Sequence, residues 1–355
     1  MKRLLVITFS LILCCSTFAQ QRISISGNKF MLNGKECFFV GANTPWDNWN
    51  DFGGNYNGDF WEQEFSRLEQ YGFNASRIWI SCDALGQPTV DNEGVPHAAS
   101  QQFWNNMDDM LAKAQKHHIY ILATVMSFDH LDNTKKDSEN WMALLACTQK
   151  VKQYCDTFLI PLVERYKNNP YLFAIDLCNE PEWIHEHKKY GGLEWDYMQM
   201  FVGMCAAAIH EVKSPILVTV GSAAVKWSCD KIDGNKWSDE ILQDMTMNPL
   251  AYLDFWQIHY YEWTNQFDNP FHKNPEYWGL NDKPCIIGET PGNNTIYGFP
   301  ITYEEIFSLP YSLGYSGVFP WTSNGAGEGD FGNLNTFGDG GKNFSKKIKQ
   351  NLKSK

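Results

Sequence analysis

Short apolar runs alternate with longer amphipathic stretches along nearly the whole chain. The runs are rich in Ile, Val, Leu and Phe and carry few polar residues, which is typical of parallel strands buried on both faces. Eight of them are predicted as strands: 37–42, 75–80, 119–125, 172–177, 216–220, 255–259, 285–288 and 317–320.

The stretches between these runs show helical spacing. In 101–117, one apolar face is formed by residues three or four positions apart: Phe103, Met107, Met110, Leu111 and Ala114. The predicted helices are 60–71, 101–117, 148–166, 195–212, 239–245, 275–280, 303–313 and 342–352. Repeated strand–helix units without an internal linker predict an α/β fold, a single-domain (β/α)8 TIM barrel.

Residues 22–35 precede the first repeat and have a different pattern. Two short alternating runs are separated by Gly27-Asn28 and followed by Asn33-Gly34. This pattern predicts an N-terminal β-hairpin, because such dipeptides favour tight turns between strands. We expect the hairpin to close the bottom of the barrel.

The first nineteen residues have the pattern of a secretory signal peptide. Lys2 and Arg3 are followed by an apolar stretch and then by Thr17-Phe18-Ala19, which predicts cleavage after Ala19. The apolar stretch is too short for a transmembrane helix. We therefore expect 1–19 to be removed and 20–355 to form the barrel domain of a secreted or periplasmic protein.

Composition narrows the function classes. The chain of 355 residues has a formal net charge of −12, which argues against a nucleic-acid partner because phosphate binding needs a basic face. Aromatic residues make up 15% and include 14 Trp, more than core packing normally requires. Tryptophan combines an apolar face with one N–H donor, so a surface rich in it is suited to stacking on sugar rings.

Eight cysteines remain after the predicted signal peptide. Several lie in apolar runs, where a free cysteine behaves as a small hydrophobic residue. Cys82 and Cys229 fall in predicted loops and could pair, although the sequence does not assign connectivity. The cysteines and histidines lack the spacing of a zinc site, so no metal is expected.

Polar residues follow the strands at the end of a TIM barrel where chemistry takes place. The fourth run is followed by Asn179-Glu180-Pro181, and the seventh by Glu289. Two carboxylates should therefore face one mouth from opposite sides. Glycosidic bond cleavage uses such a pair, one carboxyl protonating the leaving oxygen and the other attacking carbon or activating water.

Five short motifs occur in a characteristic order: RIW (77–79), NEP (179–181), HYY (259–261), IGE (287–289) and PW (320–321). In this order they resemble the clan A glycoside hydrolases, specifically glycoside hydrolase family 5, across essentially the whole chain after residue 19. The resemblance implies that Glu180 is the acid/base and Glu289 the nucleophile. It also implies that Asn179 holds the 2-hydroxyl of the reacting sugar and that Trp321 forms the floor of its subsite.

Neighbouring residues suit these roles. Arg77 and Tyr261 could favour the ionised form of Glu289, and ionised Glu289 would raise the pKa of Glu180. His259 could bond to the acid/base residue or to the sugar. One departure from the family pattern follows the third strand, where many members carry His and this chain reads VMSFDH (125–130). Ser127 or His130 could contact the same sugar region.

Further candidates for substrate binding follow other strands. Asn43 ends the first strand, and six tryptophans lie on the predicted active face: Trp46, Trp49, Trp183, Trp227, Trp237 and Trp263. They could form stacking platforms along a groove. The loops 43–58 and 222–236 could instead wall off one end and favour exo action.

The leading hypothesis is a secreted retaining endo-β-1,4-mannanase acting on β-mannan or glucomannan. The alternatives are a β-1,4-glucanase, an exo-acting β-mannosidase and, in another class, a non-catalytic carbohydrate-binding barrel. The last predicts loss of one carboxylate, but Glu180 and Glu289 are both present. The chemistry requires no cofactor, and we expect a monomer without a membrane span.

Overall fold

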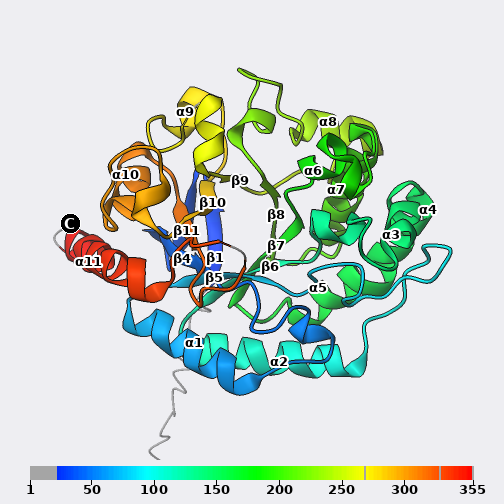
Figure 1. Ribbon diagram of the computed structural model, residues 1–355, viewed down its shortest axis with the longest axis horizontal. Coiled ribbons are helices and arrows are strands. Elements are labelled where there is room, and N and C mark those ends of the chain that lie inside the picture. The colour runs from blue at the N-terminus through cyan, green and yellow to red at the C-terminus, as the bar shows by residue number, and fades with distance from the viewer. Residues whose placement is uncertain (1–21, 268, 328, 354–355) are drawn as a thin grey trace, which may run out of the picture.

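The computed structural model describes residues 22–267, 269–327 and 329–353. Eight parallel strands form a closed barrel in which neighbours along the chain pair, and the last strand pairs with the first (Figure 1). The strands are β4 (Phe39–Asn43), β5 (Ala75–Trp79), β6 (Tyr120–Thr124), β7 (Leu172–Asn179), β8 (Leu217–Ser222), β9 (Trp256–His259), β10 (Cys285–Pro291) and β11 (Gly317–Trp321). The predicted TIM barrel is confirmed.

Helices surround the barrel (Figure 1). They are α1 (Gly58–Gln70), α2 (Gln101–Lys116), α3 (Ser138–Leu145), α4 (Thr148–Tyr154), α5 (Ile160–Tyr166), α6 (Glu182–Glu186), α7 (Trp195–Glu211), α8 (Asp239–Thr246), α9 (Pro275–Trp278), α10 (Glu305–Leu313) and α11 (Leu334–Lys353). The five apolar residues that predicted α2 are all buried, and Ser100 caps its N-terminus. The helix predicted from this spacing is confirmed.

The N-terminal segment is more than a hairpin. It forms an antiparallel sheet of three strands, β1 (Ile23–Ser26), β2 (Lys29–Leu32) and β3 (Lys35–Cys37). The sequence does not predict the third strand, because Lys35-Glu36-Cys37 is short and mostly polar and Cys37 continues into the apolar run of the first barrel strand. The expected position is confirmed, since fully buried Phe30 packs 5.1 Å from the rings of Phe39 and Phe255.

Two predicted helices differ markedly from those observed, whereas the limits of the other six agree to within two residues. The stretch 148–166 is divided by a π-helical segment (Cys155–Leu159) between α4 and α5. Pro161 lacks the N–H that a regular α-helix would need there. The last helix begins at Leu334 rather than at residue 342. Its glycines disfavour a helix, yet a Cβ on Gly340 would lie 2.5 Å from the backbone of Tyr303.

The barrel interior is divided between apolar and polar layers. The lower interior holds one buried cluster that includes Phe30, Phe39, Phe173, Phe255 and Phe319. Toward the carboxyl ends of the strands, the buried side chains become polar: Asn43, Arg77, Asp176, Gln257 and His259. The polar layer lies directly beneath the end of the barrel where the predicted carboxylates lie.

All eight cysteines from Cys37 to Cys285 are free in the structure, so the possible pairing of Cys82 with Cys229 is not formed. Both are buried among other side chains and act as small core residues. The predicted signal peptide lies outside the described residues. Among the helices that the structure describes, none combines the length and apolar character needed to span a membrane.

Candidate active site

A cavity of about 970 Å³ opens at the carboxyl ends of the barrel strands. Eight of the eleven predicted site residues line it: Trp46, Asn179, Glu180, Trp183, Tyr261, Trp263, Glu289 and Trp321. The other three, Asn43, Arg77 and His259, lie behind the cavity wall and are at most 1% exposed. The ordered motifs therefore converge on one site.

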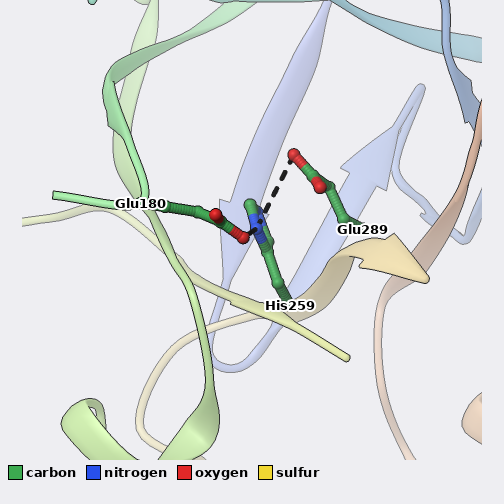
Figure 2. Close-up of side chains that lie close together, drawn as sticks. All are labelled: Glu180, His259 and Glu289. Atoms are coloured by element: carbon green, nitrogen blue, oxygen red, sulfur yellow. Dashed lines mark hydrogen bonds and ion pairs between the residues drawn. The ribbon is translucent and has the colours of Figure 1, made fainter. Parts of the chain in front are cut away.

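The two predicted carboxylates face each other across this site. Glu180 directly follows β7, and Glu289 lies within β10. Figure 2 shows both converging with His259, and oxygen or nitrogen atoms of the three side chains lie within 4.8 Å of one another. A retaining glycosidase places its carboxyl groups about 5–5.5 Å apart, whereas an inverting enzyme needs roughly 6.5–9.5 Å. The separation fits the retaining arrangement.

The carboxylate of Glu289 accepts hydrogen bonds from one cation and one hydroxyl. Arg77 donates to its Oε1 at 2.6 Å, and the Tyr261 hydroxyl donates to its Oε2 at 2.8 Å. Both hydrogen bonds stabilise a carboxylate, and the guanidinium adds an opposite charge. The predicted contacts of Arg77 and Tyr261 are thus present, and the geometry suits a nucleophile.

Glu180 has the opposite setting. Burial raises the pKa of its carboxyl to about 7, despite the hydrogen bond that Trp183 Nε1 donates to Oε2 at 2.8 Å. The expected rise is present, but burial is its largest cause rather than the charge of Glu289. Glu180 also has a left-handed backbone, with φ of 47°, and its N–H donates to Gly221 O at 2.7 Å. Such strain in a non-glycine residue is typical of functional sites.

His259 connects the two carboxylates. Its Nδ1 lies 2.9 Å from Glu180 Oε1 and 3.6 Å from Glu289 Oε1 (Figure 2). Burial lowers the pKa of His259 to about 4, so the ring is neutral at pH 7. By changing tautomer, a neutral imidazole can accept a hydrogen bond from protonated Glu180 or donate one to its carboxylate. His259 is therefore a suitable partner for Glu180, which must first donate a proton and later act as a base.

Asn43 supports the site from behind rather than facing the cavity. Its side-chain amide donates to Gly288 O at 3.0 Å and to Phe319 O at 2.9 Å, and its Oδ1 accepts from Arg77 at 3.2 Å. These bonds use both N–H groups of the amide and one acceptor position of its oxygen. The prediction of direct substrate contact by Asn43 is therefore not supported, because the strand end directs it inward.

Two buried carboxylates were missed by sequence reasoning. Asp176 accepts from Arg77 Nε at 2.9 Å and Nη2 at 2.7 Å, which fixes the guanidinium beneath Glu289. Glu182 accepts from Ser222 Oγ, Ala223 N and Trp237 Nε1 at 2.7–3.0 Å, which joins the segment after β7 to the loop after β8. The only sequence signal for Asp176 was an acidic residue inside an apolar strand.

The cavity tryptophans form two groups. Trp46 lies between Trp49 and Trp321, at ring distances of 4.6 and 6.0 Å, and Trp79 packs 5.2 Å from Trp321. The second group is Trp183 with Trp263, 5.4 Å apart. Both groups line the cavity and offer faces or edges to a sugar chain.

Trp227 and Trp237 are not stacking platforms, contrary to expectation. Their exposed fractions are 2% and 1%. Trp227 packs behind Trp183 at 5.7 Å, and Trp237 bonds to Glu182. The loop 222–236 folds back onto the barrel instead of forming a cavity wall, whereas the loop 43–58 contributes Trp46 and Trp49 to the cavity.

The trio of Glu180, His259 and Glu289 has the spacing of metal ligands. Arg77 already supplies a positive charge at 2.6 Å from Glu289, which opposes binding of a further cation. The arrangement is better suited to nucleophilic attack by one carboxylate and proton transfer by the other.

Comparison with known proteins agrees with this geometry. The family model described as cellulase (glycosyl hydrolase family 5) matches residues 25–303. A mannan endo-1,4-β-mannosidase of Mytilus edulis is 30% identical over 90% of this chain and 92% of its own length. The structure of a β-mannanase from the same mussel superposes with a TM-score of 0.81 at 27% identity, over 92% of this chain and 97% of that one. A β-1,4-mannanase of the sea hare Aplysia kurodai gives 0.78 at 26%, over 93% and 97%.

Proposed function

Because the chain belongs to glycosyl hydrolase family 5 and is a glycoside hydrolase, we propose that it is an endo-β-1,4-mannanase that cleaves β-mannan or glucomannan with retention of configuration. The observation that carries the chemistry is the pair of Glu180 and Glu289 in unlike surroundings within 4.8 Å. The observation that favours mannan is that the relatives sharing nearly the full length are named as mannanases.

The proposed reaction has two steps. Glu289 attacks the anomeric carbon while protonated Glu180 gives its proton to the leaving oxygen, so that a covalent glycosyl-enzyme forms and the distal sugar chain departs. Glu180, now ionised, takes a proton from water as the water attacks the same carbon, and Glu289 is released. His259 keeps its 2.9 Å hydrogen bond to Glu180 in both steps, because its ring can accept from the protonated carboxyl and donate to the carboxylate.

The tryptophan groups support binding of a chain that passes across the reacting bond. One group surrounds Trp321, and the other is formed by Trp183 and Trp263. Trp183 also donates its N–H to Glu180, so this group lies on the side of the acid/base carboxyl. Sugar-stacking surfaces in two places are what internal cleavage of a polymer needs.

Activity is expected to fall as pH rises through about 7. Burial raises the pKa of Glu180 to about 7, and the acid must be protonated for the first step. Below that pH the proton is present, and above it the fraction of competent enzyme decreases about tenfold per pH unit. Values of kcat/KM on soluble glucomannan, obtained from initial rates between about pH 5 and about pH 9, test this expectation. A rate that stays level or rises through this range would contradict the assignment of Glu180.

The substrate is tested with three soluble polymers: β-mannan, glucomannan and β-1,4-glucan. New reducing ends and viscosity are measured together, with Glu289→Ala as the inactive control. The proposal expects a rapid fall in viscosity on mannan and glucomannan and little change on glucan. Preference for glucan would instead identify a β-1,4-glucanase, and release of single mannose units without a fall in viscosity would identify an exo-acting β-mannosidase.

Export is part of the proposal, because a polymer-degrading enzyme must meet its substrate outside the cell. It rests on the basic start, apolar stretch and Ala19 of the N-terminal segment. An intact mass beginning at Gln20 for the exported protein is expected. A full-length protein that stays inside the cell would refute this part.

A further inference from the structure

The segment after β6, VMSFDH (125–130), supplies a further carboxylate to the cavity. Ser127 and His130, either of which could contact sugar according to the sequence, are both fully buried. Asp129 lies between them in a short 3-10 helix (Phe128–Leu131) and lines the cavity with Phe128. The cavity-facing polar residue of this segment is therefore Asp129.

The surrounding turn holds Asp129 in a fixed place. Ser127 Oγ donates to Asp129 Oδ2 at 2.8 Å, and Ser127 forms a parallel β-bridge with Asn179, beside Glu180. Below the turn, the His130 ring contacts the backbone of Ser127 through Nδ1 and the hydroxyl of Ser81 through Nε2 at 2.9 Å. Asp129 is thus anchored to the strand that carries the acid/base carboxyl.

Asp129 retains capacity to accept hydrogen bonds. Within the described part of the chain, its Oδ1 has no hydrogen-bond partner and its carboxylate has no ion pair. The two lysines that line the same cavity are paired elsewhere, Lys135 with Asp83 at 3.5 Å and Lys189 with Asp132 at 3.0 Å. Burial raises the pKa of Asp129 to about 6, so it is still largely ionised at pH 7. A partly buried carboxylate in this state favours neutral donors that can replace water.

We propose that Asp129 contacts substrate by accepting hydrogen bonds from the two adjacent free hydroxyls of a sugar unit beside the scissile bond. Internal units of a β-1,4-linked chain keep hydroxyls on carbons two and three, and the two oxygens of one carboxylate can accept from such a pair. The inference rests on the proposed function, because it needs a sugar chain in this cavity. It adds a substrate contact from the segment 125–130 after β6.

The test compares Asp129→Asn with Asp132→Asn. Asp132 lines the same cavity, but its oxygens are already used by Thr134 N, Thr134 Oγ1 and Lys189 Nζ, at 2.9, 2.7 and 3.0 Å. For Asp129→Asn we expect KM on mannopentaose to rise about tenfold, while kcat stays within about twofold, as for a loss of uniform binding. Asp132→Asn is expected to change KM by less than about twofold.

A second measurement separates contact from folding. In a Glu289→Ala background, titration with mannopentaose should give a Kd about tenfold weaker when Asp129→Asn is added, with the melting temperature of the two proteins nearly equal. An unchanged KM and Kd would overturn the inference. The inference would also be overturned if Asp129→Asn lowered kcat and changed the pH dependence of activity while KM stayed the same. Asp129 would then act on the charge of Glu180 rather than on the sugar.

Failure of the proposed substrate is distinguishable from failure of the inference. If the wild type cleaves β-1,4-glucan and not mannan, the proposed function is wrong in its sugar. The same two variants are then compared on cellopentaose, where the tenfold rise in KM is again the expected result. Equal KM for wild type and Asp129→Asn on the cleaved oligosaccharide would refute the contact.

Discussion

Replacing Glu289 with alanine is expected to lower kcat on β-mannan by about 10⁴-fold or more, while the Kd for mannopentaose changes by less than about tenfold. Without this carboxylate, no group is placed to attack the anomeric carbon. Sugar binding should survive because the tryptophan groups do not depend on it. Arg77 should stay in place because Asp176 holds it at 2.7 and 2.9 Å. Steady-state kinetics and a binding titration of the same preparation measure both quantities.

The matched control is Glu262→Ala, which removes a carboxylate from the rim of the same cavity. It is expected to keep kcat within about threefold. Added azide should partly restore turnover of an activated aryl β-mannoside by Glu289→Ala and give the α-mannosyl azide, because azide occupies the place of the lost carboxylate. Wild-type kcat in Glu289→Ala would refute the nucleophile assignment and revive the non-catalytic barrel as an explanation.

Glu180→Gln is expected to reduce kcat on β-mannan by about 10³-fold, the size of a general acid–base contribution. The loss should depend on the leaving group. A dinitrophenyl β-mannobioside needs little protonation, so its first step should stay fast and a burst of dinitrophenol should precede slow turnover. Stopped-flow absorbance measures the burst, and the fall in activity near pH 7 should disappear from the pH profile of the first step.

Glu182→Gln provides a stringent comparison for that experiment. Burial raises the pKa of Glu182 to about 7, as it does for Glu180, but the side chain bonds to Ser222, Ala223 and Trp237 away from the cavity. Glu182→Gln should therefore keep the wild-type fall in activity near pH 7. If Glu182→Gln removed this fall while Glu180→Gln left it unchanged, Glu180 would not be the acid.

The fold could be predicted from the sequence because each barrel strand is apolar and each is followed by a helical period. The two catalytic carboxylates could also be predicted from the sequence, because Glu180 and Glu289 directly follow apolar runs. The strand pattern does not predict whether a side chain at the end of a strand points into the cavity or into the barrel. Asn43 ends a strand as Asn179 does, yet its amide bonds to two backbone carbonyls inside the barrel. Sequence position gave no information on which of the two would meet the cavity.

The other residues of the site could not be placed from the sequence because their positions depend on loop conformation. Trp183 and Trp227 both follow strands in polar surroundings, but one lines the cavity and the other packs behind it. Asp176 and Glu182 bond to Arg77, Ser222 and Trp237, which lie 40 or more residues away from them in the chain. Such pairings depend on tertiary packing and leave only a lone acidic residue in the sequence.

The phenylalanine cluster at the bottom of the barrel has a consequence for how this enzyme can diversify. Phe30, Phe39, Phe173, Phe255 and Phe319 pack together in one apolar cluster, at the end of the barrel remote from the carboxylates. The residues that stabilise the barrel are therefore separate from the residues that determine which sugar is bound. New specificities can arise by exchange of mouth residues such as Asp129 while the foundation of the barrel remains unchanged.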